Sequence, residues 1–297
     1  MDSIALSIKV VYNLDINDTL TANKYCMRYF EFRQTITEGG NVFKDSSGQT
    51  QTTRINKDDI EPTIKWLESI TQLPLVDNTL GSVGKKANSG DLDIAVDEKA
   101  ISKDQLYAHL ATWVQSQGIP QDEIVNTSKY KGGWLDKTGI SVHFKTPIQG
   151  NPQMGFVQTD FMFTDDLEWM KFAMFSAGDA SKYSGADRNL MKSSIAKSMG
   201  DLKYSWQKGL MNRQSGEVLS RHPDAIAATL LGPGHTRNDL DSVETIMAAL
   251  SKNPNKIQWI RNLVPKLRDP TDKKPGQIKV DNEEADRIEN ALKALQQ

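Results

Sequence analysis

The sequence has a single cysteine, Cys26, among its 297 residues. One cysteine cannot form a disulfide within the chain, so the disulfide-rich class of small secreted domains is excluded. No apolar run approaches the roughly 20 residues that a membrane-spanning helix needs. The first residues also lack the basic stretch before an apolar run that marks a signal peptide. We therefore expect a soluble protein of the cytoplasm.

The chain also lacks a strong net charge, which is -2 at pH 7. A general attraction to nucleic acid or to a membrane surface is therefore not expected. Hydrophobic residues make up 38% of the sequence, which is ordinary for a globular protein, and the length suits one large domain or two modest ones. There is no internal repeat.

Strand and helix patterns divide the chain into two parts. Apolar and polar residues alternate in LDIAVD (92–97), ISVHFK (140–145) and GFVQTDFMF (155–163), which predicts half-buried strands. LPLVDNTLGS (73–82) also suggests a strand that runs into a turn. Beyond residue 166 the patterns are mostly helical. We predict the α+β class: a catalytic domain over residues 1–166, with a mixed sheet and flanking helices, and a mostly helical domain over 167–297.

Three acidic side chains are candidates for one site. Asp91 and Asp93 are two residues apart on one predicted strand, so they point the same way, a few ångströms from each other. Asp160 lies on the polar face of another predicted strand. Carboxylates held this close raise one another's pKa unless a cation lies between them. If the strands are neighbours, three hard oxygen ligands suited to Mg²⁺ converge.

The turn before these acids carries groups suited to phosphate. Gly81 permits a close backbone approach, and Ser82 offers a hydroxyl and an N–H. Lys85 and Lys86 add positive charge where a triphosphate would lie. A hairpin of this kind would present the phosphate on the turn and the metal ligands on the next strand.

Together, Gly81-Ser82, Ser89-Gly90-Asp91-Leu92-Asp93-Ile94 and the later Asp160 resemble the nucleotidyltransferase superfamily of DNA polymerase beta, the CCA-adding enzymes and poly(A) polymerases. The resemblance covers about 85 residues. It implies two bound ions, Mg²⁺ or Mn²⁺. Asp91 and Asp93 would bind both ions, and Asp160 would bind the ion that activates the acceptor hydroxyl. It also implies an NTP substrate such as ATP. Many members have an arginine in the turn, where this chain has Val83-Gly84-Lys85, and lysine lacks the bidentate fork of arginine.

The same residues also fit non-catalytic roles. The acids can be the solvated face of a strand, and Asp165 or Asp166 can be the third ligand instead, although both lie where a helix cap is expected. Lys85 and Lys86 can be a solvated hairpin tip. His143 either contacts the substrate or acts as a base, or it is simply solvated.

The predicted helical part is unevenly charged. Residues 182–213 contain seven basic and two acidic residues, and residues 252–279 contain eight and two. Such segments either track a phosphate backbone or form solvated helix faces. Arg188 and Lys192, one helical turn apart, are the best candidates for further nucleotide-phosphate contacts. The favoured acceptor is an RNA or tRNA 3′ end. A protein or small-molecule acceptor is the second possibility, and a non-catalytic binding or assembly module is the third.

Overall fold

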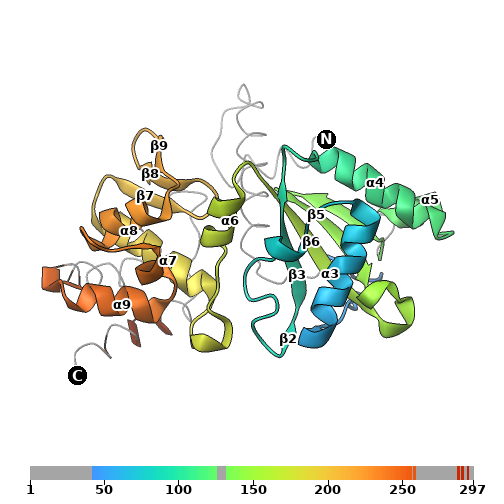
Figure 1. Cartoon of the computed structure of the whole chain (residues 1–297), viewed down its shortest axis with the longest axis horizontal. Helices are drawn as coiled ribbons and strands as arrows, with labels where there is room; N and C mark the ends of the chain where they lie inside the picture. Colours follow the sequence, from blue (N-terminus) through green and yellow to red (C-terminus); the bar gives the residue numbers. More distant parts are fainter. Residues whose placement is uncertain are drawn as a thin grey trace, which may run out of the picture. The chain divides into compact units, whose positions relative to one another are not determined.

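The computed structural model describes residues 42–125, 132–255, 257–258, 286–287, 289–290 and 293. These residues belong to one compact unit of the chain. The described residues contain helices and three separate sheets (Figure 1), so the fold is mixed α/β, as predicted. No helix in these ranges has the length and apolarity needed to cross a membrane.

The largest sheet contains the three segments in which apolar and polar residues alternate. Its strand order is β3-β6-β5-β4. The strands are β3 (Asp91–Asp97), β4 (Leu135–Thr138), β5 (Ser141–Pro147) and β6 (Phe156–Thr164). β3 runs parallel to β6, whereas the β6–β5 and β5–β4 pairs are antiparallel. The acid-bearing strands are therefore direct neighbours, which the prediction of one site required.

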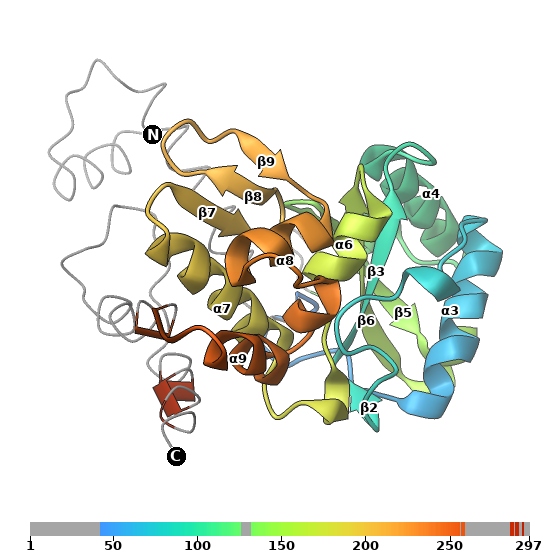
Figure 2. The ribbon, with the colours of Figure 1, turned by 60° about the vertical axis from the view of Figure 1, so that its left-hand side comes forward.

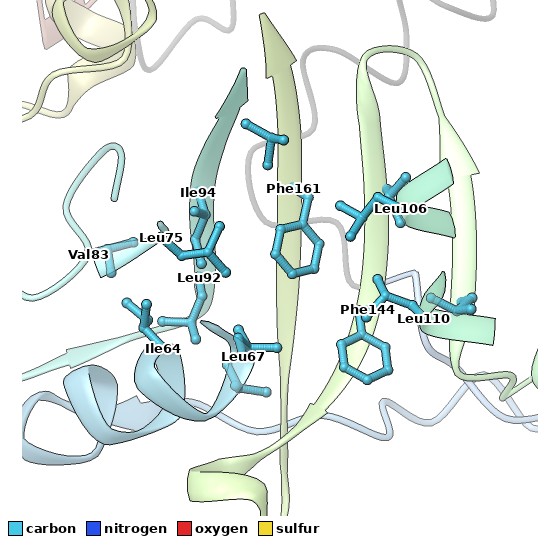
Figure 3. Close-up of a cluster of buried hydrophobic side chains, with 14 of the residues drawn as sticks. Ile64, Leu67, Leu75, Val83, Leu92, Ile94, Leu106, Leu110, Phe144 and Phe161 are labelled. Atoms are coloured by element: carbon cyan, nitrogen blue, oxygen red, sulfur yellow. The ribbon is translucent and has the colours of Figure 1, made fainter. Parts of the chain in front are cut away.

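One face of this sheet forms a hydrophobic core with helices α3 (Lys57–Thr71) and α4 (Lys103–Ser116). Figure 3 shows Leu92, Ile94 and Phe161 of the strands facing Leu67 of α3 and Leu106 of α4, and all five side chains are fully buried. Burying one such side chain contributes about 1.5–3 kcal/mol. The period-two alternation of β3 therefore determines its orientation, because rotating the strand would expose Leu92 and Ile94 and bury the acids.

Local signals at the helix starts agree with this packing. The hydroxyl of Ser102 accepts from the backbone N–H of Gln105, and the Gln105 side chain accepts from the N–H of Ser102, which forms a capping box before α4. α3 begins after Asn56, but the side chain of Asn56 donates to Asp59 rather than capping the backbone.

The opposite face of the sheet is partly apolar and partly polar. At its apolar end, Ala95 and Met162 are buried together with Met170 of α6 (Leu167–Ala173). Figure 2 shows α6 beside β3. The acids precede this apolar end along their strands, so they lie just outside the region that α6 covers.

The later part of the chain is mostly helical among its described elements, but it also contains a small sheet that was not predicted. Its sheet has the order β7-β8-β9. The elements are α7 (Gly185–Ser198), β7 (Leu202–Ser205), β8 (Gly209–Asn212), β9 (Val218–Ser220), α8 (Pro223–Leu231) and α9 (Val243–Ser251). The strands have only three or four residues, too few to show a clear alternation. The buried residues that form the hydrophobic core of this region all lie between residues 169 and 250.

The expected strand over 73–82 is also wrong. The chain forms a 3-10 helix there, η2 (Val76–Asn78), and only a single bridge, Thr79 to Ile94, joins it to the sheet. The remaining short elements are β1 (Ile55–Asn56), β2 (Asn88–Ser89), α5 (Gln121–Ile124), η3 (Ile148–Gly150), η4 (Pro152–Met154), η5 (Gly178–Ala180) and η6 (Arg237–Leu240). Most of the second basic segment, 252–279, lies outside the described residues.

Candidate metal centre

Asp91, Asp93 and Asp160 converge on the polar face of the large sheet. The register of β3 and β6 places Asp93 opposite Asp160 and Asp91 opposite Gln158. One carboxylate oxygen from each acid lies within 4.8 Å of the others. The predicted acidic cluster is therefore present, and all three residues are half-buried.

Electrostatics within the cluster favour a bound cation. Burial, and then the nearby carboxylate of Asp160, raise the pKa of Asp91 from 3.8 to about 6, while Arg54 acts in the opposite direction. A raised pKa here means that the ionised form of Asp91 is disfavoured when no cation offsets it. Because a divalent cation would offset both the burial and the repulsion, three acids at this spacing can hold one.

The spacing fits magnesium-sized ions. Mg²⁺ binds oxygen at 2.0–2.1 Å, so two ligands of one ion are at most about 4.2 Å apart. A spread of up to 4.8 Å therefore needs small side-chain rotations for one ion, or suits two ions about 3.5–4 Å apart. Carboxylate oxygens are ligands for Mg²⁺, Ca²⁺ and Mn²⁺ alike, so the donor set admits a metal without selecting one.

The alternative third ligands have other roles. Oδ1 of Asp166 accepts from the backbone N–H of Trp169 at 2.9 Å and caps α6. Oδ1 of Asp165 lies 2.6 Å from Nη1 of Arg221 in an ion pair. Neither acid belongs to the cluster, so Asp160 is the third member.

The Gly-Ser turn lies beside Asp93. The N–H of Leu80 donates to the backbone carbonyl of Asp93 at 2.9 Å. The next residue, Gly81, has φ +60, and a Cβ there would lie 3.6 Å from Oδ2 of Asp93. Glycine is favoured at this φ, so Gly81 lets the turn approach the carboxylate closely. Ser82 follows, half-buried. The predicted adjacency of turn and acids is confirmed.

The two lysines of the turn differ in their contacts. Both are exposed, but Lys85 is held by residues around it. Nζ of Lys85 donates to the carbonyl of Ser176 at 2.9 Å and lies 4.1 Å from the centre of the Phe175 ring. Burial, and then the charge of Arg188, lower the pKa of Lys85. The carbonyl of Ser176 thus uses one of the three N–H donors of the Lys85 ammonium, which leaves two for a phosphate.

Arg188 and Lys192 lie in the interior, which does not match the prediction that they offer accessible phosphate contacts. Arg188 is 1% exposed, and its guanidinium donates to the carbonyls of Leu240, Phe172 and Ala173. Lys192 is fully buried, and its ammonium has no hydrogen-bond partner in the described structure. α7 contacts α8, α9 and β7, so this face of the helix is covered.

Three residues at the site were not predicted in these roles. His143 and Gln158 both donate to the carboxylate of Asp160. The two-residue spacing of Gln158 and Asp160 on one strand was a usable signal, since it places both on the same face, whereas His143 lies on a different strand from the acids. Arg54 donates to Oδ1 of Asn88 at 2.6 Å and lowers the pKa of Asp91. Arg54 is 37 residues before Asp91, and no local pattern links the two.

Comparison with models of protein families, with curated proteins and with solved structures found no match to this chain.

Proposed function

We propose that this chain is a nucleotidyltransferase that moves an NMP from an NTP to an acceptor hydroxyl, with a nucleotidyltransferase-type arrangement around its mixed sheet. The observation that carries the proposal is the convergence of Asp91, Asp93 and Asp160 beside the Gly81 turn. Each feature alone is common among proteins. The three acids on two paired strands, with a glycine turn against one of them, form a more specific combination.

In the proposed reaction the acceptor oxygen forms a bond to the α-phosphorus, and the bond from that phosphorus to the leaving pyrophosphate breaks. The hydroxyl proton leaves to water. Asp91 and Asp93 would hold both Mg²⁺ ions, and Asp160 would hold the ion on the acceptor side. When bound, these ions supply the positive charge that stabilises the attacking and leaving oxygens. Ser82 and Lys85 would hold the β- and γ-phosphates, with Lys86 at the edge.

The first test compares Asp91→Asn/Asp93→Asn with Asp97→Asn, using each labelled NTP, Mg²⁺ and total RNA. Asp97 lies on the same face of β3 but outside the cluster, so it is a matched control. We expect the double variant to lose label transfer and Asp97→Asn to keep it. Transfer that persists in the double variant would remove this mechanism.

We propose an RNA 3′ end, tRNA in particular, as the acceptor. Five of the seven cations in residues 182–213 lie outside the buried core, and Lys182, Lys203, Lys208 and Arg213 are exposed. Such cations suit a polyanion. Binding to tRNA should then fall steeply with added salt. Digesting the labelled product with ribonuclease or protease would identify the acceptor, and a protease-sensitive label would favour a protein acceptor.

A non-catalytic module is the remaining alternative. It predicts that the chain binds no Mg²⁺-NTP, or that it binds the nucleotide without transferring it to any acceptor. The presence of all three acids favours the catalytic proposal.

A further inference from the structure

His143 is held between Asp160 and Thr138 on the polar face of the large sheet. Its Nδ1 lies 2.7 Å from Oδ1 of Asp160, and its Nε2 lies 2.8 Å from Oγ1 of Thr138. The register of β5 and β6 pairs His143 directly with Asp160. Since both ring nitrogens have partners and the residue is 8% exposed, the ring has one defined orientation.

The chemistry of the partners defines the direction of the hydrogen bonds. An ionised carboxylate can only accept, so Nδ1 of His143 carries the proton and donates to Asp160. In the neutral ring, Nε2 then accepts from the hydroxyl of Thr138. This arrangement leaves neither ring nitrogen free to take a proton from a substrate. A general base needs a free nitrogen within reach of that proton. The geometry therefore does not support this role for His143.

Gln158 makes the second contact to the same carboxylate. Its Nε2 lies 2.9 Å from Oδ1 and 3.1 Å from Oδ2 of Asp160. The backbone N–H of Val42 donates to Oε1 of Gln158 at 3.0 Å, so the nitrogen end of the amide must face Asp160. The carboxylate is thus restrained by donors from β5 and from its own strand.

We infer that His143 is a positioning residue that sets the rotation of the Asp160 carboxylate for a divalent cation shared with Asp91 and Asp93. The inference rests on the proposed metal site and adds a residue to it. His143 itself touches neither the cation nor the substrate. By binding one face of the carboxylate, it leaves the remaining lone pairs of Asp160 to the cluster. Donors behind a metal-binding carboxylate are worth about 10–100-fold in metal affinity.

The experiment measures Mn²⁺ affinity directly, by electron paramagnetic resonance of the free ion, so it needs no acceptor and no activity. The full chain is compared with His143→Ala, His143→Asn and His143→Gln. Asparagine places its amide nitrogen as many bonds from Cα as Nδ1, whereas glutamine places it as far as Nε2. His109→Ala is the matched control, because His109 lies on α4 and contacts the carbonyl of Ile70. Asp160→Asn defines the loss of the site.

We expect His143→Ala and His143→Gln to weaken Mn²⁺ binding about 10-fold or more. His143→Asn should stay within about threefold of the unaltered chain, and His109→Ala should be unchanged. A residue with only a structural role would not separate asparagine from glutamine in this way. If circular dichroism shows that His143→Ala does not fold, the comparison of His143→Asn with His143→Gln tests the inference.

Two results would overturn the inference, and they are distinguishable. If the three His143 variants bind Mn²⁺ as the unaltered chain does, while Asp160→Asn loses it, then His143 does not position Asp160 and the metal site stands. If Asp160→Asn binds Mn²⁺ as well as the unaltered chain, or if neither binds it, the metal site itself is wrong. The proposed function then fails with it.

Discussion

Asp93 and Asp160 are register partners on the parallel strands β3 and β6. Parallel partners project from the same face of a sheet, so the two carboxylates meet even though 66 residues separate them in the sequence. Asp91 completes the cluster from the same strand as Asp93.

Divalent metal should stabilise the folded chain. At an ion concentration 100 times the dissociation constant, binding to the folded state alone adds about 2.7 kcal/mol to the free energy of unfolding. We expect a higher melting temperature with Mg²⁺ or Mn²⁺, and its return to the starting value after a chelator is added. Asp160→Asn should lose this response, whereas Asp97→Asn should keep it. Equal responses in the two variants would contradict the assignment of the cluster.

Gly81→Ala should reduce metal affinity, whereas Gly84→Ala should not. Both glycines have positive φ, +60 and +72, so each substitution costs about 1–2 kcal/mol of stability. Only at position 81 does the new methyl group lie near Oδ2 of Asp93, while Gly84 has nothing within 4 Å. Chemical denaturation measures the loss of stability that the two variants share, and Mn²⁺ titration measures the difference between their metal affinities. Equal metal affinity in the two variants would show that the turn does not influence Asp93.

Lys145 should make stability rise with pH in the alkaline range. Burial lowers its pKa from 10.5 to about 8. Between these values the unfolded chain holds the proton and the folded chain has released it, so the free energy of unfolding increases with pH. Lys145→Met removes this titration. Denaturation curves at pH 7.5 to 9.5 should therefore show the unaltered chain gaining stability relative to Lys145→Met, and parallel pH profiles would contradict the shifted pKa.

Lys192→Met should stabilise the fold. Lys192 is fully buried without a hydrogen-bond partner, and burial lowers its pKa well below 10.5. Methionine has a similar length and no donor to satisfy, so we expect a gain of about 1–3 kcal/mol, the usual cost of an unsatisfied buried group. Lys197→Met, on the same helix but less buried, should stay within about 0.5 kcal/mol.

A loss of stability in Lys192→Met would mean that the aromatic contacts of the ammonium outweigh its desolvation. Nζ of Lys192 lies 4.7 Å from the centre of the Phe172 ring and 4.6 Å from that of Tyr204.

The sequence by itself determined which way the strands of the large sheet face. Leu92 and Ile94 alternate with Asp91 and Asp93, and period two leaves one arrangement that buries the apolar set. The start of α4 is local in the same way, because the hydroxyl of Ser102 accepts from a backbone N–H of the first helical turn. These features are local, since each depends on residues within one turn or one strand of the chain.

Only the tertiary structure decided which residues of different strands meet and which cations are buried. The β5–β6 register, which pairs His143 with Asp160, depends on the packing of the whole sheet. Arg188 and Lys192 have the spacing of a solvated helix face, but α7 contacts α8, α9 and β7. A helix sequence shows its own polar stripe and not the number of neighbours that cover it, so the burial of these cations could not be predicted from their pattern.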